Sequence, residues 1–196
     1  MEGFFVEPTL YTGRDGEKSA AGSKQGMVYD FLDRLEISYM RADHAPADTI
    51  AQCGEIEKIL GAKVCKNLFL RSRQADAFYL LLLPGDKPFR TAVVSKLLGV
   101  SRLSFAEPEY LAHYLGVTPG SVSALGLIHD TGHAVRLLID REVCSENFIG
   151  CHPCVNTSTL RLHTADLLGK FLPAVGHTPT ILDIPRPVPE NGSGEQ

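Results

Sequence analysis

A lysine and an asparagine interrupt a stretch that otherwise has the composition of a buried β-strand. Residues 63–70, with the sequence KVCKNLFL, are rich in β-branched, aromatic and aliphatic side chains. Because side chains alternate along a strand, Lys66 is expected on a mainly aliphatic face with Val64, Leu68 and Leu70. An unpaired ammonium is costly in such surroundings. Lys66 is therefore either a lysine that reaches solvent at the sheet edge, or a cavity lysine that holds a phosphate or polarises a carbonyl.

Other basic residues surround Lys66, and no acid interrupts them. The run from residue 58 to residue 73 contains Lys58, Lys63, Lys66, Arg71 and Arg73. The whole chain of 196 residues has a formal net charge of −4, which argues against a charge-driven nucleic-acid coat protein. The run still predicts a local positive patch that can recognise one end of an RNA.

A glycine-containing loop is the second candidate for a functional segment. Residues 116–124 read GVTPGSVSA, so two glycines, a proline and small hydroxyl residues follow a predicted helix. Such loops can aim backbone N–H groups at an anion or a carbonyl, although most Pro-Gly loops are only turns. Both interpretations remain open from the residues alone.

The third candidate is the segment CHPCVN at residues 151–156. Its Cys-x-x-Cys spacing admits a thioredoxin-like redox pair, or a zinc site completed by Cys144 and a histidine, although the ligand spacing is poor for zinc. The chain's five cysteines have no framework spacing and fit free thiols, which favours Cys154 as a small apolar filler over a metal or redox role. His152 and Asn156 stand out as polar groups in a stretch that otherwise suits a buried sheet.

Helices and strands that position these segments interleave irregularly. Thr49 or Asp48 can cap a helix that ends at Gly61, and Thr164 can cap the last helix. The pattern predicts helices over 24–36, 50–60, 93–98, 107–115 and 165–174, and strands over 37–42, 63–70, 77–83, 103–105, 125–128, 135–139, 147–152, 157–162 and 180–184. Several hairpins and no repeating βαβ unit indicate an α+β fold.

Domain organisation follows from the composition of the two ends. Residues 1–22 are predicted to be a flexible N-terminal extension, and residues 185–196 a flexible Pro/Gly-rich tail. A single folded domain is expected over 23–184. No apolar run approaches the roughly 20 residues that span a membrane, and the first residues lack a signal-peptide pattern, so we expect a cytoplasmic protein.

Taken together, the three candidate segments resemble the YbaK/ProX family of aminoacyl-tRNA deacylases, and within it the free-standing prolyl-tRNA editing proteins. The matching pieces are KNLFL at 66–70, GVTPGSVS at 116–123 and HPCVNT at 152–157, in the family's order and spacing. With weaker matches, the resemblance covers about residues 27–184. It implies a single compact YbaK-like domain with a mixed, curved β-sheet flanked by helices, and neither a metal nor another cofactor.

The resemblance also implies a role for each motif. Lys66 would be central to catalysis with Asn67 beside it, and His152 would help to hold the 3′-terminal adenosine. Ala124 departs from the family, whose loop usually carries a proline there, so the loop is expected to be more mobile. The expected substrate-binding residues are Gly120, Ser121, Val122, Ser123 and Asn156, and the expected tRNA-binding residues are Lys58, Lys63, Arg71 and Arg73.

The expected function is therefore trans-editing hydrolysis of a mischarged tRNA, with Ala-tRNA(Pro) as the substrate and water as the nucleophile. The expected partner is the acceptor end of tRNA(Pro), prolyl-tRNA synthetase is a further candidate partner, and neither DNA nor a membrane is expected. The alternative is a non-catalytic tRNA-binding or scaffolding module of the same fold.

Overall fold

A computed structural model describes residues 4–16, 20, 22–47 and 49–186 of the chain. Its strands are β1 (Val6–Thr12), β2 (Tyr39–His44), β3 (Lys63–Arg71), β4 (Phe78–Pro84), β5 (Ser104–Phe105), β6 (Val135–Asp140), β7 (Phe148–Cys151), β8 (Ser158–His163) and β9 (Thr180–Leu182). Its helices are α1 (Lys24–Arg34), α2 (Ile50–Leu60), α3 (Thr91–Leu98), α4 (Pro108–Leu115), η1 (Ala124–His129), α5 (Arg141–Ser145), α6 (Thr164–Asp166), η2 (Leu167–Phe171) and α7 (Leu172–Ala174). Asp48 and residues 187–196 of the predicted tail lie outside the described residues.

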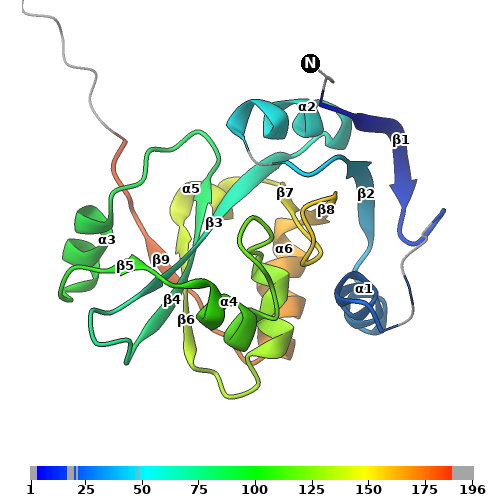
Figure 1. Ribbon diagram of the computed structural model, residues 1–196. Helices are drawn as coiled ribbons and strands as arrows, with labels where there is room; N and C mark the ends of the chain where they lie inside the picture. The colour runs from blue at the N-terminus through cyan, green and yellow to red at the C-terminus, as the bar shows by residue number, and fades with distance from the viewer. Residues whose placement is uncertain (1–3, 17–19, 21, 48, 187–196) are drawn as a thin grey trace, which may run out of the picture.

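The strands form one mixed, nine-stranded sheet in the order β1-β2-β8-β7-β3-β4-β6-β9, with β5 paired to β3 (Figure 1). The pairs β3–β7, β4–β6 and β6–β9 are parallel, and the others are antiparallel. Helices α1 and α4, together with η1, η2 and α7, cover one face of the central strands, and α3 covers the other. This arrangement confirms the predicted α+β class with a mixed sheet flanked by helices.

The free edge of β3 is the feature that matters for function. One edge of β3 pairs with β4 along Cys65–Arg71. The other edge pairs with β7 only at Lys63 and Val64, and with β5 only at Leu70 and Arg71. Within the described part of the chain, residues 65–68 therefore have no strand partner on that side. An unpaired strand edge offers backbone groups to another molecule unless something covers it.

Local signals around α2 explain why β3 begins where it does. Thr49 is the N-cap, and its reciprocal hydrogen bonds with Gln52 make a capping box, as the sequence predicted in part. Gly61 ends the helix with a φ of 65°, a left-handed conformation that favours glycine. The Glu57 carboxylate then accepts a 2.8 Å hydrogen bond from the Val64 backbone, which ties the last turn of α2 to β3.

Several sequence predictions were wrong. The predicted flexible extension contains strand β1, whose Val6 and Leu10 pack against a small apolar cluster formed in part by α2. Pro8 is tolerated in β1 because β1 is an edge strand. Residues 125–128 lie in the 3-10 helix η1 rather than a strand, since Ser123 caps its first turn through the Leu125 backbone. Thr164 begins the last helix instead of capping it. Helix α5 was not predicted.

None of the helices in the described residues is long and apolar enough to cross a membrane.

Candidate active site

A pocket of about 530 Å³ opens beside the free edge of β3. Strand β3 forms one wall, α2 a second, and the loops after β4 and α4 and the end of β7 complete it. All three predicted catalytic residues, Lys66, Asn67 and His152, line this pocket. So do Gly120 and Val122 of the predicted substrate loop and Lys63 of the predicted tRNA patch. The fold therefore brings together the three motifs that are far apart in the sequence.

The Lys66 ammonium is held from the loop that follows β4. Its Nζ donates a 3.0 Å hydrogen bond to the backbone carbonyl of Lys87. The Lys87 side chain is buried and its own Nζ lies 2.8 Å from Asp140 Oδ2 and 2.9 Å from Glu142 Oε1. This buried ion pair fixes the loop and with it the carbonyl that orients Lys66. Because a lysine has further N–H donors, the same ammonium can also bind a ligand in the pocket.

Asn67 acts as a brace between β3 and the 116–124 loop. Its Oδ1 accepts a 3.1 Å hydrogen bond from the Ala124 backbone, and its Nδ2 donates to the Cys65 carbonyl at 3.1 Å. Both ends of the amide are therefore engaged by the protein. These contacts position the loop beside Lys66, and they use only one of the two N–H donors of the Asn67 amide, which lines the pocket.

Ser121 and Ser123 are buried, while Gly120 and Val122 line the pocket. Ser123 is fully buried, and its hydroxyl donates to the His152 carbonyl and accepts from the Leu125 backbone. Gly120 has a φ of 86°, a left-handed conformation that a residue with a side chain adopts only under strain. The loop is thus tied by hydrogen bonds to both neighbouring motifs.

His152 is a buried, neutral imidazole with a defined tautomer. Its Nδ1 lies 3.0 Å from the Ser158 carbonyl and 3.3 Å from Thr159 Oγ1. A carbonyl only accepts, so Nδ1 carries the proton and Nε2 is left as an acceptor for a bound molecule. Burial lowers the pKa of His152, which keeps the ring neutral near pH 7.

A second histidine supports the first through Thr159. His44 Nδ1 is 2.8 Å from the Ala45 carbonyl and must donate, so its Nε2 accepts from Thr159 Oγ1 at 2.9 Å. Burial also lowers the pKa of His44. No pattern in the sequence links His44 to Thr159, because β2 and β8 meet only in the folded sheet.

The remaining predicted site residues do not gather at the pocket. Asn156 does not line it. Lys58 is exposed on α2 and pairs with Glu55, and Arg73 lies in the turn after β3. Arg71 is at the opposite end of β3, where its Nε and Nη2 bind Glu107 and its Nη1 donates to the Ser72 and Arg73 carbonyls. The sequence missed the pocket acids Glu57 and Asp86, because they come from elements outside the three motifs.

Cys65, Cys151 and Cys154 are held as protonated thiols, which makes them poor nucleophiles. Burial raises the pKa of Cys65 and of Cys154 to about 12 in each case, and it also raises the pKa of Cys151. Cys151 and Cys154 are free thiols that pack in the main apolar cluster. Across the described residues, no group of three or more histidine, cysteine or acidic side chains is placed to hold a metal ion.

Comparison with known proteins identifies the family. The model of the aminoacyl-tRNA editing domain matches residues 44–170, which include every pocket-lining residue. The chain belongs to this family. It is 35% identical over 155 residues to a prolyl-tRNA synthetase associated domain-containing protein of Danio rerio, covering 78% of this chain and 83% of that protein. It is 31% identical over 156 residues to the prolyl-tRNA editing protein ProX of Acetoanaerobium sticklandii, covering 80% and 94%.

The fold is shared with solved structures as well. A crystal structure described as a proposed trans-editing enzyme for prolyl tRNA synthetase superposes with a TM-score of 0.63 at 16% identity, over 84% of this chain and 99% of that one. At this identity the likeness concerns the fold alone, and it agrees with the YbaK-like architecture predicted from the sequence.

Proposed function

We propose that this protein is a hydrolase that edits mischarged tRNA(Pro) in trans, with Ala-tRNA(Pro) as its substrate. The observation that carries the proposal is the fixed ammonium of Lys66 in a pocket that it shares with the Gly120 loop and His152. The family's editing activity and the names of the two relatives support the same substrate class.

The chemistry requires little from the protein. An aminoacyl ester is already activated, so positioning, a polarised carbonyl and an attacking water are sufficient. Water adds to the ester carbonyl carbon, the bond to the ribose oxygen breaks, and that oxygen leaves with a proton as a free hydroxyl. Lys66 supplies positive charge to the carbonyl or to the neighbouring phosphate, and His152 Nε2 accepts a hydrogen bond from the terminal nucleoside.

The need for a separate editing site follows from the limits of binding selectivity. A synthetase pocket shaped for proline excludes a smaller amino acid by only about 1–3 kcal/mol, because the difference is one or two methylenes. A second site of limited size can admit alanine and reject proline by steric exclusion. The 530 Å³ pocket, with Val122 and Cys65 on its walls, has the size expected for a nucleoside with a small aminoacyl group.

The test compares hydrolysis of Ala-tRNA(Pro) and Pro-tRNA(Pro) by the wild type and by Lys66→Met. We expect the wild type to cleave the alanyl ester in preference, and the variant to lose about 100-fold or more in kcat/KM, the effect of removing one charge-stabilising donor. Lys170→Met removes an exposed lysine that pairs with Asp166 and should behave as the wild type.

Two results would contradict the proposal. Equal hydrolysis by Lys66→Met would remove the lysine from the mechanism. A wild-type protein that binds tRNA(Pro) but leaves both esters intact would be the scaffolding module of the same fold instead.

A further inference from the structure

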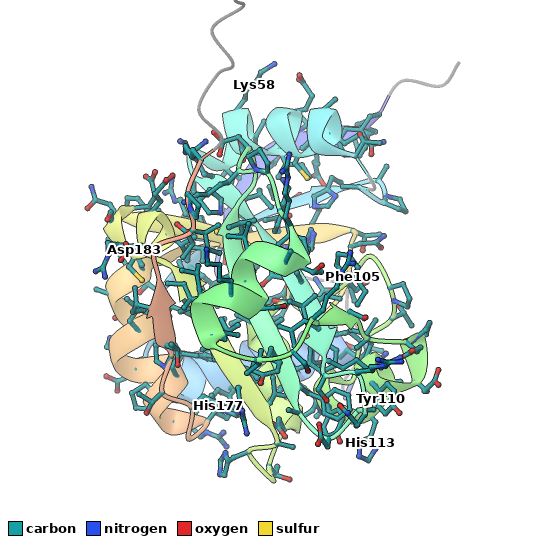
Figure 2. All side chains as sticks on the ribbon, turned by 90° about the vertical axis from the view of Figure 1, so that its left-hand side faces the viewer. Lys58, Phe105, Tyr110, His113, His177 and Asp183 are labelled. Atoms are coloured by element: carbon teal, nitrogen blue, oxygen red, sulfur yellow. The ribbon has the colours of Figure 1, made fainter. Side chains whose placement is uncertain are left out.

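The basic run predicted to bind tRNA is largely neutralised in the fold. Lys58 pairs with Glu55 at 2.6 Å, Lys63 lies 3.8 Å from Glu146, and Arg71 is held by Glu107. Three of its positive charges are therefore offset by adjacent carboxylates. Lys58 also points outward from α2 at one end of the molecule, as Figure 2 shows. The run therefore leaves less free positive charge for a tRNA backbone than the sequence suggests.

Unpaired positive charge is concentrated around α3. Residues 87–106 contain no acid. Three exposed basic side chains in this segment, Arg90, Lys96 and Arg102, have no carboxylate within ion-pair distance in the part of the chain that the structure describes. The fourth, Lys87, is buried and occupied by Asp140. Arg90, Lys96 and Arg102 thus give this face an uncompensated charge suited to phosphates.

The same face exposes apolar side chains, most notably an aromatic ring. Phe105 is 57% exposed, and Leu97 of α3 is 45% exposed. The Phe105 ring meets Phe89 edge to face at 5.6 Å, which fixes one side of the ring and leaves the rest open. Figure 2 shows Phe105 beside α3 on the face turned toward the viewer. Exposed aromatic rings among basic residues are the usual platform for single-stranded nucleic acid.

The position of Phe105 relative to the pocket makes this arrangement specific. Strand β5 pairs with the same edge of β3 that is free at the pocket, and Phe105 lies opposite Leu70. Directly paired residues share a face of the sheet, so Phe105 is on the face of Leu70, Leu68 and Lys66. Strand geometry puts Phe105 roughly 8 Å from the pocket residue Leu68. Nucleotides that precede a terminal adenosine in the pocket can span that distance.

We propose that Phe105, Arg90, Lys96 and Arg102, hereafter the α3 surface, bind the acceptor arm of the tRNA. Phe105 stacks on an unpaired base of the 3′ end, and the three basic residues contact phosphates of the acceptor stem. This inference rests on the proposed function in that a tRNA 3′ end occupies the pocket. In this arrangement the α3 surface makes the main contacts with the RNA backbone, in place of Lys58 and Arg71.

The test measures binding of an uncharged acceptor-stem minihelix, with and without its single-stranded 3′ end, so that no hydrolysis is needed. Arg90→Gln/Arg102→Gln should weaken binding of both RNAs and reduce the slope of log affinity against log salt by roughly 1.5–2. Phe105→Ala should weaken binding about tenfold, and only for the RNA that has the 3′ end. The control Arg34→Gln/Lys170→Gln removes the same charge from α1 and η2 and should leave binding and the salt slope unchanged.

A parallel assay separates this inference from the proposed function. Hydrolysis of alanyl-adenosine, which has no acceptor stem, should be the same in the α3-surface variants as in the wild type. If the wild type cleaves no alanyl ester, the proposed hydrolase activity is wrong, but the minihelix measurements still test RNA binding by the α3 surface. Wild-type minihelix affinity in both α3-surface variants would overturn the inference, as would a loss of binding to prolyl-tRNA synthetase without any change in RNA binding.

Discussion

Replacing Lys87 by methionine should destabilise the protein far more than removing a surface lysine. Lys87 is 2% exposed and Asp140 is fully buried, and Lys87 Nζ lies 3.0 and 2.8 Å from the two Asp140 oxygens. Methionine keeps most of the side-chain length but leaves the Asp140 carboxylate buried without its cation. Removing one partner of a buried pair costs about 3–5 kcal/mol, because the remaining charge is uncompensated.

The same substitution should also impair hydrolysis. The Lys87 carbonyl is the acceptor that orients Lys66 Nζ, so an unanchored loop misplaces the ammonium even though Lys66 itself is intact. We expect kcat/KM for Ala-tRNA(Pro) to fall about tenfold or more in protein that is still folded, since small misplacements at a reacting centre are costly. Lys87→Met/Asp140→Asn should recover part of the stability, because the asparagine is neutral and can still accept from the Glu142 backbone.

Urea unfolding followed by far-ultraviolet circular dichroism measures the stability change, since the chain has no tryptophan to report by fluorescence. The control Lys170→Met breaks an exposed pair with Asp166 and should cost less than about 1 kcal/mol. If the free energy of unfolding of Lys87→Met lies within about 1 kcal/mol of the wild-type value, the buried pair contributes no more than a surface pair, and the expected destabilisation is wrong.

The remaining predictions concern the support of His152 and the acid side of the stability profile. Thr159→Val should raise KM with a smaller effect on kcat, because it removes the hydroxyl that joins His152 to His44 and His152 Nε2 binds the terminal nucleoside, whereas Thr159→Ser should restore KM; an equal change in both variants would indicate a packing defect. Arg186 and then Lys87 lower the pKa of Glu142 from 4.5 to about 2. A depressed carboxyl pKa stabilises the fold above the unfolded value, so this contribution should disappear as the pH falls from about 4.5 to 2. Arg186→Gln should weaken the dependence of the free energy of unfolding on pH in that range. An unchanged dependence would show that the ion pair between Arg186 and Glu142 does not contribute to stability.

Local signals in the sequence were sufficient for the elements that carry the site. The capping box at Thr49 and the glycine at Gly61 bound α2, and alternation in residues 63–70 placed Leu68 and Phe69 in clusters on opposite faces of β3. These features depend on neighbours a few residues away. The resemblance to the editing family then supplied the link between Lys66, the Gly120 loop and His152, which no local pattern contains.

What the sequence could not supply depends on long-range pairing. The free edge of β3 exists because β7 and β5 pair with its two ends only, and nothing within residues 63–71 shows this. A local count of charges predicts that Arg71 contacts RNA, yet its partner Glu107 is 36 residues away. The apolar run at 125–128 predicts a strand but forms a 3-10 helix, and composition does not distinguish the two when both are buried.

The hydrogen bond between Asn67 and the 116–124 loop also explains why alanine suits position 124. A proline at this position has no backbone N–H and could not donate to Asn67 Oδ1, whereas Ala124 does so at 3.1 Å. The chain therefore gives up the fixed φ of proline and gains a hydrogen bond between the loop and the residue next to Lys66. Ser123 anchors the adjacent residue to the His152 carbonyl. Two consecutive loop residues thus connect the β3 motif to the His152 motif, so the loop holds its position in the pocket through hydrogen bonds in place of a stiff backbone.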